Sequence, residues 1–475
     1  MADIGQVYET LFKTFREGTC RPLSYRRSQL YALARLCQEN QDALFEALFT
    51  DLGKPKLEFL AYEVGAVVER ALTSAEKLEE WSAPEPRTNV PDWQKGWNPT
   101  VYRTPKGPIL VISPWNYPLI LTLQSIIAAM AAGCPAVAKP SELVPTFSSL
   151  LATLFPKYLD PKAYVVINGA VSETTTLLSL RWAHIFYTGN GRVGRIVATA
   201  AAKHLTPVSL ELGGKSPVYV DAESLSPAEL RVVASRILYG KCANSGQTCV
   251  APDYVLIPRT AQLALVDAFA SVLEERYPNS EGGPLQSTSY GRIINSSHFS
   301  RLKSLLTNTK GNIVIGGQNE ESRLKIAPTI VTNVSLSDPL MADEIFGPIL
   351  PIVPVSDLSD AIIHINSGDN PLSMYVFTLD PEVKKRLLEE TLSGSIIFND
   401  TFDQLAVSEL PFSGVGESGY GTQILRYGYE GFTHLRSSED VPLTLEPVFS
   451  ARYPPHTPDK LEFMSAATRI PIPTE

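Results

Sequence analysis

Two short segments place a potential nucleophile and a potential base in the chain. Cys249 ends the run NSGQTC at 244–249, and Glu211 opens the run ELGGKSP at 211–217. Both runs contain glycine, which lets backbone come close to a bound molecule. A thiol that attacks a carbonyl carbon and a carboxylate that activates water would together support covalent catalysis. A cysteine by itself is more often a small buried apolar residue than a nucleophile, so the context of Cys249 must decide.

Two further motifs accompany the first pair. Trp115 and Asn116 lie upstream, and the run EIFGP occupies 344–348 downstream. In order and spacing, the four motifs resemble those of the NAD(P)-dependent aldehyde dehydrogenases, and the resemblance extends from the N-terminal helical region to Arg436. It is closest to the class 3 branch, which includes enzymes for fatty and medium-chain aldehydes. The resemblance implies an α/β fold with two Rossmann-like open parallel-sheet domains, one for the cofactor and one catalytic, plus a small β-arm for oligomerisation.

The resemblance also implies a reaction, the oxidation of an aldehyde to a carboxylic acid. Cys249 would form a thiohemiacetal and then a thioester, which an activated water hydrolyses. Asn116 is the expected oxyanion donor, together with the backbone N–H of Cys249. Glu211 is the expected general base, because partial burial at the end of an apolar strand would raise the pKa of its carboxyl group. Glu344 could share that role.

Each of these residues also has an ordinary structural interpretation. Asn116 could be a turn residue between two prolines, Glu211 a surface glutamate at a strand end, and Glu344 a helix N-terminal charge. Cys242 is a second candidate thiol, but its surroundings match no motif, and we interpret it as structural. The complete motif set favours the catalytic interpretation of the other residues.

A glycine-rich turn could hold the cofactor phosphates. Gly189, Asn190 and Gly194 belong to GNGRVG at 189–194, which follows a strand-like run and precedes a helix-like one. A single GxGxxG is weak evidence, and no acidic residue about twenty positions on is placed for a ribose. The resembled family usually has Gly-Ser-Thr-x-x-Gly here, so phosphate contacts in this chain would come from backbone amides or Asn190.

The remaining cofactor contacts are implied by the resemblance. Lys139 and Glu142 would hold the adenosine ribose, where a carboxylate repels the 2′-phosphate of NADP, so we expect NAD, with NADP possible. In isolation this pair would be interpreted as a solvated charged turn. Glu344 and Phe346 would contact the nicotinamide ribose and ring. Trp115 and Leu212 complete the expected cofactor set.

The expected substrate side chains are Tyr117 and Phe412. Phe412 lies in LPFSGVGESG at 410–419, which matches a family loop over the active site, although a core phenylalanine is an equally good interpretation. Many class 3 members have a histidine shortly before this loop, where this chain has Ser408 and Glu409. The aldehyde is therefore left open among aliphatic, aromatic and terpenoid classes, as is the choice between detoxification and biosynthesis.

The elements that must position these residues alternate between strands and helices. Amphipathic patterns predict helices over 24–50, ended by Gly53, and over about 57–80. The expected strands are Pro108–Ser113, Ala136–Ala138, Tyr164–Ile167, His184–Tyr187 and Val208–Glu211, with helices over Leu119–Ala132 and Val193–Lys203 between them. This alternation predicts a parallel sheet with covering helices, and it restarts at Pro217–Val220. Later expected strands lie near 253–257, 313–315, 328–333, 349–354 and 395–398, with helices near 227–240 and 260–276.

We therefore predict four parts. Residues 1–86 and 106–210 form the NAD-binding domain, and 211–412 the catalytic domain. Residues 87–105 and 413–440 form the oligomerisation arm and active-site loop, which is expected to pair across a two-fold axis in a homodimer. Residues 441–475 are a proline-rich tail that lacks the C-terminal anchor of some relatives.

Bulk properties exclude several classes of function. The 475 residues carry a net charge of −9 in mixed signs, which argues against nucleic-acid binding. Five cysteines, an odd and irregular set, and an N-terminus without a secretory apolar core favour a reducing cytoplasmic compartment. No histidine has metal-ligand spacing, so no metal is expected. The uncharged stretch 107–138 is interrupted by prolines, which disfavours a membrane span.

Alternatives to aldehyde oxidation remain. A coenzyme-A-acylating aldehyde dehydrogenase would use the thiol of coenzyme A in place of water, and a water-activating glutamate disfavours it. A catalytically idle family member with a binding role would not need every catalytic position filled, as they are here. A cysteine protease would need a histidine in a partner motif, which the chain lacks.

Overall fold

The computed structural model describes residues 3–474 and divides into two compact units. The first unit joins the N-terminal segment up to Trp81 with Pro105–Thr433. The second joins Ser82–Thr104 with the segment from His434 onward. The predicted assignment of cofactor binding and catalysis to separate residue ranges stays a prediction.

The first unit contains a six-stranded sheet with the order β17-β7-β6-β3-β4-β5. Its strands are β3 (Ile109–Ile112), β4 (Ala136–Lys139), β5 (Tyr164–Val166), β6 (His184–Thr188), β7 (Val208–Glu211) and β17 (Gly419–Tyr420). All neighbours are parallel except β17, which runs antiparallel to β7. The chain moves outward from β3 in one direction to β5 and in the other to β7. The switch point between β3 and β6 is where open parallel sheets bind ligands, at the carboxyl ends of the strands.

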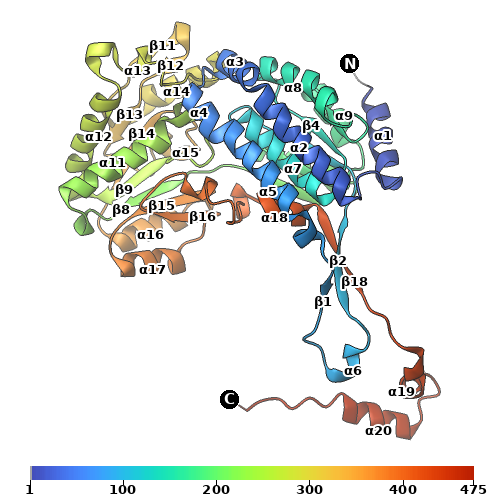
Figure 1. Ribbon diagram of the computed structural model, residues 1–475. Coiled ribbons are helices and arrows are strands. Elements are labelled where there is room, and N and C mark those ends of the chain that lie inside the picture. Colours follow the sequence, from blue (N-terminus) through green and yellow to red (C-terminus); the bar gives the residue numbers. More distant parts are fainter. Residues whose placement is uncertain (1–2, 475) are drawn as a thin grey trace. The chain divides into compact units, whose positions relative to one another are not determined.

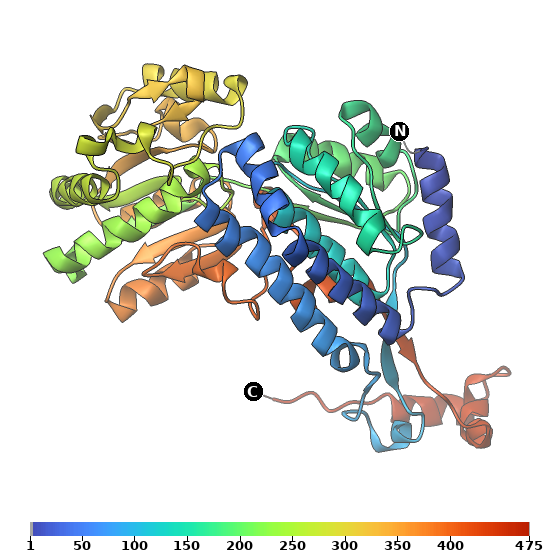
Figure 2. The same ribbon diagram turned by 45° about the horizontal axis from the view of Figure 1, so that its top comes forward.

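Helices cover both faces of this sheet, as Figures 1 and 2 show. Helix α7 (Pro118–Ala132) is almost entirely buried because it packs against β3 and β4 on one side and α2 on the other. The other helices of this half are α1 (Ile4–Arg16), α8 (Pro145–Tyr158), α9 (Val171–Leu178), α10 (Gly191–Ala202) and α18 (Leu425–Gly431). The uncharged stretch 107–138 is thus a buried strand, a loop, a buried helix and a second buried strand. Within residues 3–474, no helix is long and apolar enough to cross a bilayer.

The single helix predicted over 24–50 is wrong, because the structure has two helices there. Helix α2 (Leu23–Glu39) ends and α3 (Gln41–Leu52) begins around Asn40, whose φ of −114° and ψ of 20° are not helical. The Asn40 side chain donates to the Leu36 carbonyl, which satisfies a carbonyl freed at the helix end. Gly53 ends α3 in the left-handed conformation, as predicted.

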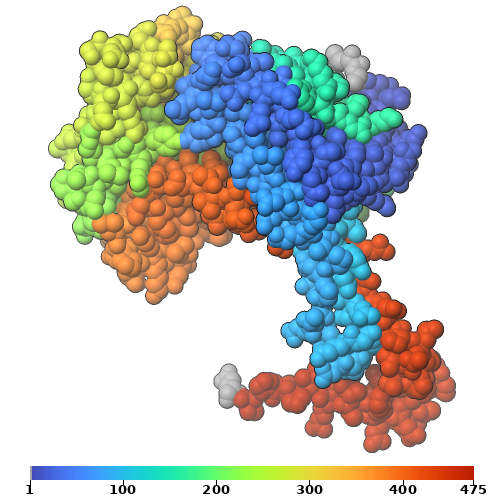
Figure 3. All heavy atoms as spheres, viewed as in Figure 1, coloured from blue at the N-terminus to red at the C-terminus, as the bar shows by residue number. Residues whose placement is uncertain are grey.

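The second predicted helix is present and contains an irregular turn. Helix α4 (Lys56–Phe59) continues through a π-helical turn (Leu60–Val64) into α5 (Gly65–Ser82). Such turns are often found at functional sites, because the extra residue redirects the side chains around it. Figure 3 shows these N-terminal helices in blue against the green and yellow region of the second sheet. One hydrogen bond joins α4 to the segment before Cys249, because the Glu58 carboxylate accepts the backbone N–H of Asn244 at 2.9 Å.

The second sheet of the first unit has seven strands in the order β10-β13-β14-β9-β8-β15-β16. They are β8 (Pro217–Val220), β9 (Tyr254–Pro258), β10 (Asn312–Ile315), β13 (Thr329–Thr332), β14 (Ile349–Val355), β15 (Ser373–Phe377) and β16 (Ser395–Phe398). Only β10, at the edge, is antiparallel to its neighbour. The pattern predicted every strand of this sheet except β15, which lies at its switch point beside β8.

Two apolar cores cover the faces of the second sheet. Helices α11 (Pro227–Cys242) and α12 (Gln262–Arg276) build one core, and α14 (Ser296–Asn308), α16 (Leu358–Asn366) and α17 (Pro381–Glu390) build the other. The short elements α13 (Gly283–Gln286), α15 (Pro339–Ala342), β11 (Asn319–Glu320) and β12 (Lys325–Ile326) complete this half. Both sheets are therefore of the doubly wound α/β type predicted from the sequence.

The second unit is built on a three-stranded sheet in the order β1-β2-β18. The strands are β1 (Glu85–Pro86), β2 (Thr100–Pro105) and β18 (Thr433–Ser438), and the short helices are α6 (Asp92–Lys95), α19 (Glu446–Phe449) and α20 (Pro458–Ala467). Large apolar side chains of this unit are exposed, among them Trp93, Leu435, Leu443, Leu461 and Phe463. The apolar pattern of the proline-rich tail had not indicated α20.

Candidate active site

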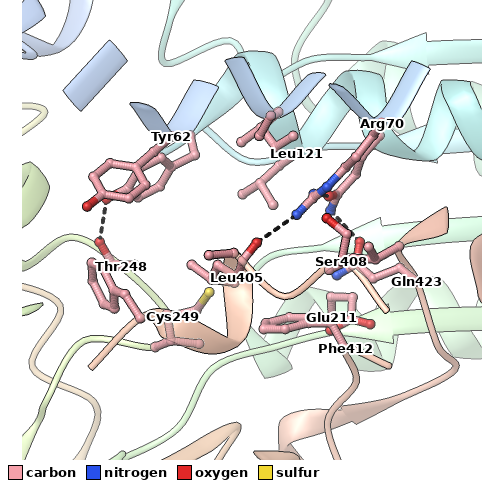
Figure 4. A pocket seen from close by; sticks show the side chains of 18 of the residues that line it. Tyr62, Arg70, Leu121, Glu211, Thr248, Cys249, Leu405, Ser408, Phe412 and Gln423 are labelled. Atoms are coloured by element: carbon pink, nitrogen blue, oxygen red, sulfur yellow. Dashed lines mark hydrogen bonds between the residues drawn. The ribbon is translucent and has the colours of Figure 1, made fainter. Parts of the chain in front are cut away.

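The Cys249 side chain lines a cavity of about 530 Å³ in the first unit. Side chains from the π-helical turn, α5, α7 and the segments that carry Glu211 and Phe412 enclose it. Figure 4 shows the Cys249 sulfur directed into this space. The other four cysteines of the chain, including Cys242, are buried, whereas Cys249 is partly exposed. Cys249 is thus the cysteine that a small molecule can reach.

The segment before Cys249 has an unusual backbone. Asn244, Ser245 and Gly246 follow one another with φ of 49°, 55° and 74°, in the left-handed region. A Cβ on Gly246 would lie 2.3 Å from the Gly347 carbonyl oxygen, so only glycine fits. The buried Gln247 amide donates to the carbonyls of Asn244 and Arg292, which holds the turn in place. Strain of this kind often marks a functional site that the surrounding structure holds in shape.

Asn116 lies against this turn. Its side-chain amide donates to the Gln247 carbonyl at 3.1 Å, two residues before Cys249. Its own carbonyl accepts hydrogen bonds from Lys54 Nζ at 2.9 Å and from Asn244 Nδ2 at 2.8 Å. The predicted nucleophile segment and the predicted oxyanion donor are therefore joined by direct hydrogen bonds.

A buried ion pair contacts the backbone carbonyl of Asn116. The side chains of Lys54 and Glu63 are both 0% exposed, with Nζ and Oε1 2.5 Å apart. The other Glu63 oxygen accepts the backbone N–H groups of Leu119 and Ile120, each at 3.0 Å, at the start of α7. Motif matching missed both residues, because Lys54 and Glu63 belong to no motif. The short helix α4 and the π-helical turn bring Glu63 back to Lys54, and the packing of this turn against the N-terminus of α7 buries the pair.

Glu211 ends β7 with its carboxyl group 2% exposed. Burial raises the pKa of this carboxyl group well above its ordinary value, and a contact with the Gln423 amide lowers it by less. Neither oxygen accepts a hydrogen bond of good geometry from any of residues 3–474. An acid that is buried without fixed partners and lines the cavity is suited to exchange a proton with a bound molecule.

The electrostatics around Cys249 favour the protonated thiol in the free protein. Burial, with smaller contributions from the nearby carboxyl groups of Glu344 and Glu211, raises the pKa of Cys249 to about 12. Burial also raises the pKa of Glu344 to about 8, with a contribution from Asp253. Attack by the sulfur therefore requires that its proton be removed, and two carboxyl groups interact with it electrostatically.

The predicted cofactor residues gather at the carboxyl ends of the first sheet. Lys139 at the end of β4 is buried and pairs with the exposed Glu142 at 2.9 Å. Asn190 caps α10 by accepting the Val193 N–H at 3.0 Å, and the start of a helix can bind an anion through its backbone N–H groups. At Gly189 a Cβ would lie 2.3 Å from the Tyr187 hydroxyl oxygen, so a larger residue there would displace the Tyr187 ring.

Three of the other predicted cofactor residues are Trp115, Phe346 and Leu212. The rings of Trp115 and Phe346 meet edge to face with centroids 5.4 Å apart, and Phe346 is held at a φ of 48°. Leu212 lines the cavity and lies 3.1 Å from the Cβ position of Gly194. The Thr188 hydroxyl is buried without a hydrogen-bond partner in the described chain. A cradle of glycines, a capped helix start, a lysine–glutamate pair and two aromatic rings fit a dinucleotide.

Both predicted substrate residues line the cavity. Tyr117 is buried and its hydroxyl accepts from Thr248 at 3.1 Å, next to the nucleophile. Phe412 is also part of the wall. Motif matching missed other wall residues, among them Tyr62, Arg70, Gln124 and Gln423. Within residues 3–474, no three His, Cys, Asp or Glu side chains gather as they would around a metal ion.

The chain was compared with known proteins. Residues 2–438 match the profile described as "Aldehyde dehydrogenase family". A dog protein named "Aldehyde dehydrogenase, dimeric NADP-preferring" is 42% identical over 96% of this chain and 98% of its own length. Aldehyde dehydrogenase family 3 member H1 of Arabidopsis thaliana is 40% identical over 98% of this chain and 95% of its own. The substrate-bound structure of Staphylococcus aureus AldH superposes with a TM-score of 0.93 at 36% identity, covering 99% of this chain and 100% of that one.

Proposed function

Because the chain belongs to the aldehyde dehydrogenase family and is an NAD(P)-dependent oxidoreductase acting on aldehydes, we propose that Cys249 is its covalent nucleophile. The observation that carries the proposal is the partly exposed sulfur in the cavity wall, hydrogen-bonded through its own segment to Asn116. No other cysteine combines exposure with such a neighbour.

Cys249 adds to the aldehyde carbon once its thiol proton has been removed, which forms a thiohemiacetal. The Asn116 amide and the Cys249 N–H stabilise the oxyanion, whose charge develops only as the bond forms. The strand-end residues described above would hold NAD(P)⁺, which would accept the hydride that leaves the former aldehyde carbon, so that the thiohemiacetal becomes the Cys249 thioester. Glu211 then takes a proton from water, which attacks the Cys249 thioester, releases the carboxylic acid and regenerates the thiol.

Two further assignments within this scheme concern the general base and the cofactor. Glu344 could replace Glu211 as the base, since both carboxyl groups have a raised pKa and both raise the pKa of Cys249 electrostatically. We assign NAD as the preferred cofactor, because the Glu142 carboxylate beside Lys139 would repel a 2′-phosphate. Comparing kcat/KM for NAD and NADP in the wild type and in Glu142→Gln tests this, and we expect the substitution to favour NADP.

We also propose that the second unit mediates a homodimer in the cytoplasm. Its exposed apolar side chains, including Trp93, Leu435 and Phe463, support an interface. The dog relative is named dimeric. Light scattering on the purified chain tests this, and a monomer at micromolar concentration would contradict it.

Trapping of the acyl-enzyme tests the covalent mechanism. In Glu211→Gln, hydrolysis slows while acylation continues, so incubation with an aldehyde and NAD should add one acyl group to Cys249, seen by peptide mass spectrometry. Cys242→Ala should leave the adduct in place as a matched control, whereas Cys249→Ala should remove it. An adduct that survives in Cys249→Ala would overturn the assignment of the nucleophile.

A further inference from the structure

One side of the substrate cavity carries a buried arginine. Arg70 projects from α5 into the wall of the cavity, 4% exposed, and Figure 4 shows its guanidinium directed toward Leu405 and Gln423. Cys249 and Glu211 line the same cavity. The chemistry proposed above for the site uses a thiol, an amide and a carboxyl group, so it gives this cation no role.

Neutral groups are the only hydrogen-bond partners of the guanidinium among residues 3–474. Nη1 donates to the Gln124 side-chain oxygen, and Nη2 donates to the Leu405 carbonyl at 3.1 Å. Nε is buried without a partner. Gln124 in turn donates to the Gln423 side-chain oxygen. Two of the five N–H groups of Arg70 are used, and none of them meets a carboxylate.

The positive charge of Arg70 is not compensated by an ion pair in the described chain. The neighbouring Glu69 is exposed, and its oxygens accept hydrogen bonds from Thr73 at 3.3 Å and Ser408 at 3.4 Å instead. Burial lowers the pKa of Arg70 to about 10, with Glu69 acting in the opposite direction, so the side chain stays charged at neutral pH. A buried cation without a counter-ion is costly, and its free N–H groups suit a carboxylate.

We propose that the substrate is an aldehyde whose far end carries a carboxylate, which Arg70 binds while Cys249 attacks the aldehyde carbon. This rests on the proposed function of Cys249. The wall also contains Ile120, Leu121, Leu372, Phe402 and Phe412, so a hydrocarbon segment joins the two ends of the substrate. The product is then a dicarboxylate.

A purely structural role for Arg70 makes a different prediction. Arg70 joins α5 to the segment around Leu405, and loss of that bond would slow the oxidation of every aldehyde alike. Recognition of a carboxylate would instead change the preference between substrates that differ only in the end group. The informative quantity is therefore a ratio of kcat/KM values.

The experiment uses azelaic semialdehyde, its methyl ester and nonanal as substrates of the full-length protein. The wild type should have a higher kcat/KM for the free acid than for the ester. Arg70→Gln should lower the acid-to-ester ratio by about 10–100-fold, the usual effect of a charged hydrogen-bonded contact, and Arg70→Lys should restore part of it. Glu69→Gln, a charge change of opposite sign at the adjacent position, should not lower the ratio.

A binding measurement keeps the test independent of variant folding and of turnover. In the wild type, azelate should slow the alkylation of Cys249 by iodoacetamide more than its uncharged dimethyl ester does. A wild-type acid-to-ester ratio at or below one, equal protection by azelate and its dimethyl ester, or an unchanged ratio in Arg70→Gln would each overturn the proposal. If the Arg70 proposal fails in one of these ways but nonanal is still oxidised, the proposed Cys249 mechanism is unaffected. If none of the three substrates is oxidised, the result contradicts the proposed Cys249 mechanism itself.

Discussion

The buried Lys54–Glu63 pair offers a test of how Asn116 is held. Glu63→Gln keeps an oxygen for the N–H groups of Leu119 and Ile120, but it removes the counter-ion of Lys54. Breaking a fully buried pair in this way costs about 3–5 kcal/mol, because one charge is left unpaired. The substitution should therefore lower the thermal unfolding temperature clearly.

The same substitution should also slow catalysis. Lys54 donates to the Asn116 carbonyl, so a displaced ammonium group shifts the residue that is proposed to stabilise the oxyanion. Loss of one oxyanion donor lowers kcat by about 10²–10³, so a donor that is only displaced should lower kcat by no more than this. We expect kcat, measured as NADH appearance at saturating aldehyde, to fall by about 10-fold or more.

A double variant separates the two effects. Lys54→Met with Glu63→Gln removes the unpaired charge, so most of the lost stability should return. The Asn116 carbonyl still lacks its Lys54 donor, so kcat should remain low. If the double variant recovers both the unfolding temperature and kcat, the pair serves folding alone, and the positional argument for Asn116 is wrong.

Three further outcomes are expected. Alkylation of Cys249 in the free protein should speed up by about tenfold per pH unit between about pH 7 and 9. The raised pKa keeps most of the thiol protonated across this range, so the reactive thiolate fraction rises about tenfold with each pH unit. A rate independent of pH would contradict this. At a fixed pH in that range, Glu344→Gln should speed alkylation by removing a charge that raises the pKa of Cys249, and a slower rate would show that Glu344 acts as its base. Asn116→Ala should lower kcat by about 10²–10³ in stopped-flow and steady-state assays while the rate of Cys249 alkylation changes little, and an unchanged kcat would remove Asn116 from the mechanism.

Much of the fold was readable from local pattern. Short apolar runs separated by helical stretches predicted the strands of the first sheet, and the restart after Glu211 predicted the second. The misses have physical causes. Asn40 interrupts a stretch whose apolar spacing continues across the break. The five residues of β15 include the strand formers Tyr375, Val376 and Phe377, but the run is short and only its parallel pairing with β8 and β16 makes it a central strand.

The chemistry of the site was also largely a property of the sequence. The runs around Cys249, Glu211 and Phe346 contain residues whose type follows from the local backbone conformation. Gly246, for example, has a left-handed backbone that favours glycine, so the sequence motif itself indicates this conformation. Local sequence also determined that the strand ends near Lys139 and Gly189 would lie together, because the carboxyl ends of parallel strands share one edge of a sheet.

Only the tertiary structure decided what surrounds these groups. The raised pKa of Glu211, the burial of the Lys54–Glu63 ion pair and the uncompensated charge of Arg70 all depend on elements that lie far apart in the sequence and pack together. Desolvation and pairing are set by which elements pack together, and no local spacing encodes them. The sequence therefore specified the proposed reacting groups, whereas the packing of α5 and α7 around the cavity determined the burial that shifts their pKa values and placed Arg70 in the cavity wall.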